Sequence, residues 1–280
     1  MTILAIIVFL VCTITLVLVE PKVPSKDQYG PFFARNFAHR GLHNIKENIP
    51  ENTIAAFHRA KEQGYGIELD IRFTKDKRIV VFHDDGLKRA CGVEKNVNEF
   101  TFDELENFGL FGTDHKIPLF SDVLKEIGGA VPMIVEFKST MSDYKELCQD
   151  AWKMLSSYEG QFCIESFDPR VVAWFNKHHA NVFRGQLTSS VRDLSGGTSK
   201  IFAFAISNVL TNVIARPHFI AHSTDKKSPM VILCQWLGAK RFIWTVRDPA
   251  LADKYELEND GVIFENYLPK PKFYKETGER

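Results

Sequence analysis

The sequence is poor in cysteine, has no excess of either charge, and contains no internal repeat. Its five cysteines are scattered and none forms a C-x-x-C pair, so neither a disulfide framework nor a thiolate zinc site is predicted. Lysine and arginine together number 35, as do aspartate and glutamate. This balance argues against a nucleic-acid partner, because a polymer of phosphates is bound by a basic excess. Nothing in the sequence indicates an obligate protein partner.

The N-terminal segment is the longest uncharged run of the chain. Residues 2–19 carry no charged side chain, and as a helix they would extend about 27 Å at ~1.5 Å per residue, close to the hydrocarbon thickness of a bilayer. A cleaved signal peptide is the alternative, but no basic residue precedes the run and a good cleavage site does not follow it. The sequence therefore predicts a single transmembrane helix over residues 1–20. Lys22 and Lys26 then place the following domain on the cytoplasmic side by the positive-inside rule.

The rest of the chain divides into a short linker over residues 21–32 and one domain over residues 33–280. In the domain, short apolar segments alternate with amphipathic helices, which is typical of a parallel α/β sheet. Its length suits a TIM (β/α)₈ barrel, which commonly has about 250 residues. Nine strand candidates are one more than a barrel needs, and we expect one of the late segments to be irregular. The candidates are 35–38, 67–73, 79–83, 133–137, 162–166, 182–187, 218–221, 241–245 and 261–264.

Two carboxylates lie in the second strand candidate, residues 67–73. Because side chains alternate along a strand, Glu68, Asp70 and Arg72 share one face. Helices cover the outside of a parallel barrel, so this charged face should point inward. Two inward carboxylates about 7 Å apart repel each other unless positive charge lies between them. A bound divalent cation is therefore predicted, and a solvated edge strand is the alternative.

The segment 133–137 repeats this pattern, with Glu136 and Lys138 on one face. Three inward carboxylates, from Glu68, Asp70 and Glu136, suit one hard cation, Mg²⁺ or Ca²⁺, better than zinc, since no thiolate accompanies them. Lys138 is predicted to hold a phosphate oxygen as a point charge. Its alternative role is a structural ion pair with Glu136.

Two histidines end apolar strand candidates. His39 follows residues 35–38 and His83 closes residues 79–83. The active site of a barrel lies at the C-terminal ends of its strands. We therefore expect His39 and His83 to act as general acid and general base on opposite sides of a P–O bond, rather than as structural residues. Arg40 offers a planar fork of donors to phosphate oxygens.

The order of these motifs resembles the glycerophosphodiester phosphodiesterase family, over roughly residues 35–268. The matching motifs are His39-Arg40-Gly41, Glu51-Asn52-Thr53, Glu68-Leu69-Asp70, His83-Asp84, Glu136-Phe137-Lys138, Ser166-Phe167-Asp168, Trp244-Thr245-Val246 and Gly261-Val262-Ile263. The resemblance implies a TIM barrel, a divalent ion at the three carboxylates, and the two histidines as the acid–base pair. It also implies that Arg40 and Lys138 contact phosphate.

The resemblance further implies that Asn52 lies at the site and that Trp244 lies near the substrate alcohol, with barrel core as the alternative for Trp244. Three places depart from the usual family pattern. Arg247 stands where asparagine is common, Phe137 stands where isoleucine is common, and residues 260–269 differ from the usual D-G-I-x-T-D-Y-P segment. These departures bear on substrate preference and leave the proposed metal ligands unchanged.

The predicted activity is metal-dependent hydrolysis of a small-molecule or lysolipid phosphodiester to an alcohol and glycerol 3-phosphate. The nucleophile is either water or the glycerol hydroxyl next to the phosphate, and either histidine is a candidate for the base. The alternative is a lysophospholipase D or related phospholipase that acts on lysophospholipids at the membrane, held there by the N-terminal helix.

Overall fold

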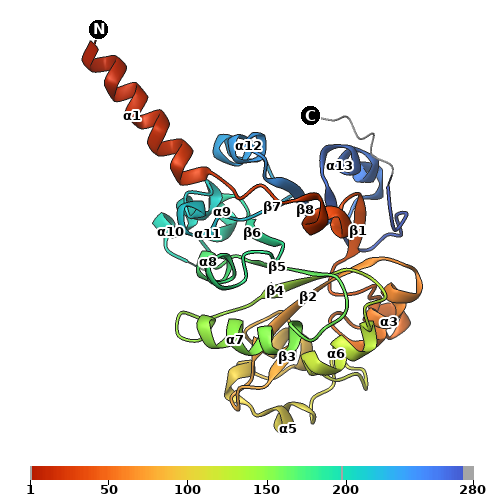
Figure 1. Cartoon of the computed structure of the whole chain (residues 1–280). Helices are drawn as coiled ribbons and strands as arrows, with labels where there is room; N and C mark the ends of the chain where they lie inside the picture. The colour runs from red at the N-terminus through yellow and green to blue at the C-terminus, as the bar shows by residue number, and fades with distance from the viewer. Residues whose placement is uncertain (1, 197, 274–280) are drawn as a thin grey trace.

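Eight parallel strands form a closed barrel in the computed structural model, which describes residues 2–196 and 198–273 (Figure 1). The order around the barrel is β1-β2-β4-β5-β6-β7-β8-β9, and β9 closes the ring by pairing with β1. The predicted TIM barrel is therefore confirmed. Its strands are β1 (Arg35–Ala38), β2 (Gly66–Phe73), β4 (Met133–Phe137), β5 (Phe162–Ser166), β6 (Arg184–Thr188), β7 (Phe219–Ser223), β8 (Lys240–Val246) and β9 (Gly261–Phe264).

The ninth strand candidate is β3 (Ile79–Val81), which lies outside the barrel and pairs antiparallel with β2. Although the late strand β8 does pair with β9 through a register shift between Ile243 and Val246, the surplus strand is thus an early segment and not a late one as predicted. The reason is the length of the connection. Only residues 74–78 join β2 to β3, enough for a hairpin, whereas a parallel crossover needs a dozen or more residues.

Helices surround the barrel, and most begin at a recognisable cap (Figure 1). The Thr53 hydroxyl accepts from the backbone of Ala56 at the start of α3, and Asp168 caps α8, which has proline at its first position. The longer helices after the N-terminal one are α3 (Ile54–Glu62), α6 (Phe120–Ile127), α7 (Tyr144–Leu155), α8 (Pro169–His178), α10 (Lys200–Ser207), α12 (Pro229–Trp236) and α13 (Ala252–Glu258). The short ones are α2 (Lys26–Tyr29), η1 (Gly30–Phe32), η2 (Ile45–Glu47), α4 (Lys88–Cys91), η3 (Val97–Glu99), α5 (Phe102–Leu105), α9 (Val191–Leu194), α11 (Asn212–Ala215) and η4 (Pro249–Leu251).

An apolar cluster fills the N-terminal end of the barrel and closes it. Phe37, Ile134 and Cys163 belong to this cluster, and each lies two positions before a polar residue of the same strand face. Phe32, from the segment predicted as a linker, stacks on Phe37 and packs against Phe183. The polar residues of the next layer therefore open only toward the C-terminal mouth of the barrel.

An insert with its own apolar core separates β2 from α6. It spans residues 74–119, includes β3, α4 and α5, and lies at one end of the molecule (Figure 1). Its core joins strand and loop residues such as Val80, Leu87, Val97 and Leu105. The insert is thus a small packed unit attached to the barrel, and it carries His83.

The N-terminal segment forms α1 (Thr2–Val19), which projects away from the barrel (Figure 1). Its last residue, Val19, is fully buried, and the Val19 carbonyl accepts a hydrogen bond of 3.0 Å from Asn212 Nδ2 of α11.

Within residues 2–196 and 198–273, the length and hydropathy that a bilayer crossing requires are not met by any helix. The prediction of a single-pass membrane protein is therefore wrong, and the cytoplasmic placement derived from it falls with it. The physical reason that the structure offers is packing, because the last turn of the 18-residue helix α1 lies against the domain, where Val19 is buried.

Candidate active site

Three buried carboxylates meet at the C-terminal half of the barrel. Glu68 and Asp70 lie on β2, and Glu136 lies opposite Asp70 on the neighbouring strand β4. One oxygen from each carboxylate lies within 4.8 Å of the other two, and the three residues are at most 7% exposed. The inward alternation expected from the sequence is therefore present, and it gathers the three predicted metal ligands.

The carboxylates repel one another, and the protein offsets this only in part. Burial raises the pKa of Glu68 well above its usual value, and the charges of Asp70 and Glu136 raise it further. Burial also raises the pKa of Glu136. Burial acts in the same direction on Asp70, but Lys138, His83 and Arg40 outweigh it and lower the pKa of that carboxyl. A buried oxygen cluster with uncompensated negative charge fits a divalent cation.

Two cations of the chain border this cluster. Lys138 Nζ lies 2.6 Å from Glu136 Oε1 and 3.2 Å from Asp70 Oδ1. Arg40 Nε lies 3.7 Å from Asp70 Oδ2, and the backbone N–H of Arg40 donates to Glu68 Oε2 at 2.9 Å. Both predicted phosphate-binding residues therefore lie beside the three carboxylates.

The turn after β1 depends on a glycine. Arg40 and Gly41 have φ values of 55° and 79°, in the left-handed region. A Cβ added at Gly41 would come within 2.8 Å of the Ala56 Cβ of α3. Glycine is therefore needed here both for its backbone conformation and for the close approach of α3.

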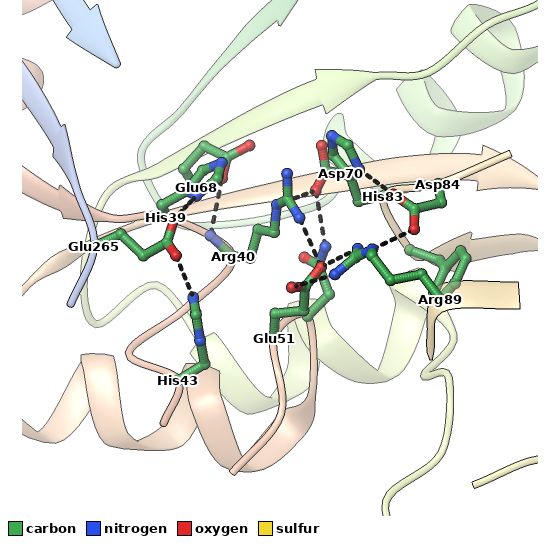
Figure 2. Close-up of polar contacts among 12 residues, drawn as sticks. His39, Arg40, His43, Glu51, Glu68, Asp70, His83, Asp84, Arg89 and Glu265 are labelled. Atoms are coloured by element: carbon green, nitrogen blue, oxygen red, sulfur yellow. Dashed lines mark hydrogen bonds and ion pairs between the residues drawn. The ribbon is translucent and has the colours of Figure 1, made fainter. Parts of the chain in front are cut away.

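His39 follows β1 and reaches the cluster from one side. Its Nδ1 lies 2.9 Å from Glu265 Oε2, and its Nε2 lies 3.9 Å from Glu68 Oε2 (Figure 2). Burial lowers the pKa of His39 to about 4, against the opposing effect of Glu265. The Nδ1 contact orients the ring so that Nε2 faces the carboxylates.

His83 reaches the cluster from the insert, not from a barrel strand as the sequence suggested. Because β3 runs antiparallel to β2, the chain returns along β2 until Phe82 N donates to Asp70 O at 3.0 Å. His83 therefore arrives beside Asp70, with its Nδ1 2.6 Å from Asp84 Oδ1 (Figure 2). The hairpin thus brings the second histidine to the same site as the first.

Asn52 and Trp244 occupy different parts of the barrel mouth. Asn52 is 1% exposed and its Nδ2 donates to Asp70 Oδ2 at 2.8 Å, so it contacts a proposed metal ligand directly. Trp244 lies on β8, across the barrel from β4, where its Nε1 donates to Ala221 O and its ring packs edge-on against Phe167. The strand of Trp244 therefore lies across the barrel from that of Glu136, while its ring contacts Phe167, which follows β5.

Glu265, which follows β9 and supports His39, was not predicted from the sequence. Glu265 also accepts from Arg247 at 2.9 Å. His43 Nε2 lies 3.9 Å from Glu265 Oε1 (Figure 2). Burial would raise the pKa of Glu265, but the hydrogen bond from His39, together with the charges of His39, Arg247 and His43, lowers it to about 2. A signal was available, because a charged residue directly after an apolar strand is the same pattern that identified His39.

Glu165 is a fourth buried carboxylate that the sequence analysis also missed. It lies on β5, opposite Glu136, is 1% exposed, and its Oε2 has no hydrogen-bond partner in the structure. Burial, and then the charge of Glu136, raise the pKa of Glu165 well above its usual value. The alternation of Cys163 and Glu165 in β5 repeats the pattern of β4 and could have revealed it.

Part of this chain is similar in sequence to part of several known proteins. The chain is 37% identical over 141 residues to a glycerophosphodiester phosphodiesterase of Caldanaerobacter subterraneus subsp. tengcongensis, an alignment that covers 47% of this chain and 57% of that protein. It is 34% identical over 123 residues to human lysophospholipase D GDPD1, covering 39% of this chain and 38% of that protein. The chain thus spans about half the length of these curated relatives.

The barrel also resembles a solved phosphodiesterase of Oleispira antarctica in complex with the product sn-glycerol-3-phosphate. The two share 21% identity with a TM-score of 0.68, over 83% of this chain and 93% of that one, and at this identity the likeness concerns the fold alone. The model of the glycerophosphoryl diester phosphodiesterase family matches residues 39–267, well over half of the 280 residues. The chain therefore belongs to the glycerophosphoryl diester phosphodiesterase family.

Proposed function

We propose that this chain is a divalent-metal-dependent phosphodiesterase that hydrolyses glycerophosphodiesters to an alcohol and glycerol 3-phosphate. The observation that carries the proposal is the buried cluster of Glu68, Asp70 and Glu136, with oxygens within 4.8 Å of one another. His39 and His83 border it, each with a carboxylate on Nδ1. The names of the relatives and the fold shared with a glycerol 3-phosphate complex support the same reading.

The three carboxylates would hold one cation, Mg²⁺ or Ca²⁺, since both take oxygen ligands. When bound, such a cation supplies positive charge that polarises a phosphoryl oxygen. Arg40 and Lys138 would stabilise the negative charge that develops on the remaining phosphoryl oxygens as the ester bond breaks. Asn52, bonded to Asp70, would hold that ligand in place.

The two histidines would carry the protons. Glu265 and Asp84 each face a histidine Nδ1, which leaves Nε2 of His39 and of His83 for exchange with substrate atoms. One imidazole would take a proton from the attacking hydroxyl, of water or of the adjacent glycerol carbon. The other, as imidazolium, would protonate the leaving alkoxide. Trp244 is proposed to line the alcohol side of the mouth.

A glycerol 3-phosphate release assay across a panel of headgroups, with Mg²⁺, Ca²⁺ or EDTA, tests this function. The wild type should release glycerol 3-phosphate with a divalent cation and lose that activity in EDTA. His39→Ala and His83→Ala should each lose roughly 10²–10⁴-fold in rate. His58→Ala, an exposed histidine on α3 that also faces carboxylates, is the matched control and should retain its rate. Near-normal turnover in both active-site variants would refute the assignment.

A second substrate class is favoured by one observation, the 34% identity to human lysophospholipase D GDPD1. Under that alternative the same residues would cleave the headgroup from a lysophospholipid. Comparing kcat/KM for glycerophosphocholine and lysophosphatidylcholine separates the two. A higher value for the soluble diester supports the main proposal, and the reverse order supports lysophospholipase D activity.

A further inference from the structure

Arg89 connects two parts of the active site that are far apart in the sequence. It lies on α4 of the insert, and its Nε donates to Asp84 Oδ2 at 2.6 Å. Its Nη1 and Nη2 donate to the two carboxylate oxygens of Glu51 at 3.0 and 2.7 Å. Glu51 belongs to the loop between β1 and α3, so one guanidinium joins the insert to the barrel (Figure 2).

Each of the two carboxylates that Arg89 holds is itself bonded to a residue of the proposed chemistry. Asp84 Oδ1 faces His83 Nδ1 at 2.6 Å. Glu51 Oε1 accepts from Arg40 Nη1 at 2.7 Å. Arg89 is therefore one carboxylate away from a proposed acid–base residue and one carboxylate away from a proposed phosphate-binding residue.

The arrangement is fixed by geometry and by charge. A guanidinium is a rigid planar fork, and here three of its N–H groups are directed at two carboxylates. The Phe111 ring centroid lies 5.3 Å from the guanidinium carbon, so an aromatic face restricts it further. Burial would raise the pKa of Glu51, but Arg89 and Arg40 together lower it, so Glu51 stays charged at neutral pH.

We propose that Arg89 is a positioning residue that sets the placement of His83 relative to Arg40. This inference rests on the proposed phosphodiesterase function of the same site. The competing explanation is an ordinary surface ion pair. The Arg89 side chain is 44% exposed, and exposed ion pairs contribute little to stability. Loss of Arg89 should therefore change catalysis far more than stability.

The contacts of Arg89 with Asp84 and with Glu51 predict a specific kinetic pattern. Asp84→Asn should lower mainly kcat, because it disturbs proton transfer by His83. Glu51→Gln should raise mainly KM, because it frees Arg40. Arg89→Met should do both, with kcat down about 10–100-fold, the usual effect of removing a residue that orients a catalytic group. Arg89→Lys should stay below wild type, because one ammonium cannot replace the fork.

The experiment compares kcat and KM for glycerophosphocholine with excess Mg²⁺, and the melting temperature, for wild type and these variants. Lys88→Met is the matched control, since Lys88 precedes Arg89 on α4 and pairs only with the exposed Glu94 among the contacts that the structure describes. The proposal expects the double variant Arg89→Met/Asp84→Asn to have nearly the kcat of Asp84→Asn alone. Fully additive losses, or an Arg89→Met enzyme within twofold of Lys88→Met, would overturn it.

A readout independent of turnover separates this inference from the proposed function. The ¹⁵N shifts of the His83 ring should change in Arg89→Met and stay unchanged in Lys88→Met. An unchanged His83 ring overturns the positioning role even if the enzyme is active. Absence of glycerol 3-phosphate release by the wild type across the headgroup panel refutes the proposed function instead.

Discussion

Glu265 Oε2 accepts a hydrogen bond from His39 Nδ1 at 2.9 Å, and Arg247 donates to the same oxygen at 2.9 Å. The second histidine has the same support, because His83 Nδ1 faces Asp84 and Asp84 accepts from Arg89. Both histidines thus have an arginine-held carboxylate behind them. A carboxylate on Nδ1 fixes the ring orientation and the position of the proton, which leaves Nε2 for chemistry.

Replacing Glu265 should therefore impair catalysis without unfolding the protein. In Glu265→Gln the amide no longer restricts His39 to one tautomer, and kcat should fall about 10–100-fold. Steady-state kinetics with glycerophosphocholine measures this. Glu62→Gln is the control, since Glu62 also pairs with a histidine, His58, but on the exposed face of α3. Equal rates for the two variants would remove Glu265 from the account.

Lys138 should matter most for stability when no divalent cation is present. Its Nζ lies between Glu136 and Asp70, and removing one member of a buried charged group costs about 3–5 kcal/mol. Lys138→Met should therefore lower the free energy of unfolding by about 3 kcal/mol in EDTA. Excess Mg²⁺ or Ca²⁺ should reduce this loss, because a bound cation restores positive charge.

Denaturant unfolding with and without the cation checks the Lys138 prediction. Lys77→Met, which removes an exposed pair with Glu146, should change little in either buffer. The decrease in the free energy of unfolding of Lys138→Met could instead be equal with and without the cation. That result would show that the bound cation does not replace the positive charge of Lys138.

Glu165 should make the metal-free protein less stable as the pH rises. Its pKa in the folded protein lies well above the ordinary value of 4.5, first because of burial. The folded state therefore binds more protons, and this carboxyl opposes folding increasingly as the pH rises from 4.5 toward the raised pKa. Glu165→Gln should then stabilise the protein at pH 8 by at least about 1.4 kcal/mol, the equivalent of one pKa unit.

Unfolding curves of wild type and Glu165→Gln in EDTA, at pH 5 and pH 8, test this. The advantage of the variant should shrink at pH 5, because this pH lies close to the ordinary pKa of 4.5 and little of the penalty for keeping the folded carboxyl protonated has built up there. A variant that is less stable at pH 8 would mean that the charged carboxylate has a partner that offsets its burial.

The sequence predicted the position and the inward face of a strand wherever apolar and polar side chains alternate strictly along it. The nine strand candidates match the nine strands, and the inward faces of β2 and β4 were read from Glu68, Asp70 and Glu136 alone. The antiparallel course of β3 was missed, because an apolar run such as Ile79–Val81 does not state its direction. The length of the preceding turn, residues 74–78, indicates this direction, because the turn is too short for a parallel crossover.

The supporting residues were harder to predict than the residues they support. Arg89 acts through three contacts whose partners lie 5 and 38 positions away, and such pairings depend on how the insert folds against the barrel. The error at α1 has a different cause. Hydropathy alone reads residues 2–19 as a span, but it does not show that Val19 is buried against the domain.

Calorimetric titration of Mg²⁺ and of Ca²⁺ into the metal-free protein tests the central claim most directly. The account predicts one high-affinity site per chain for at least one of these cations, weakened at least tenfold in Asp70→Asn and in Glu136→Gln, variants that still give the wild-type far-UV circular dichroism spectrum. Binding of equal affinity in both variants and in the wild type would contradict it, because the cation would then lie outside the cluster of Glu68, Asp70 and Glu136.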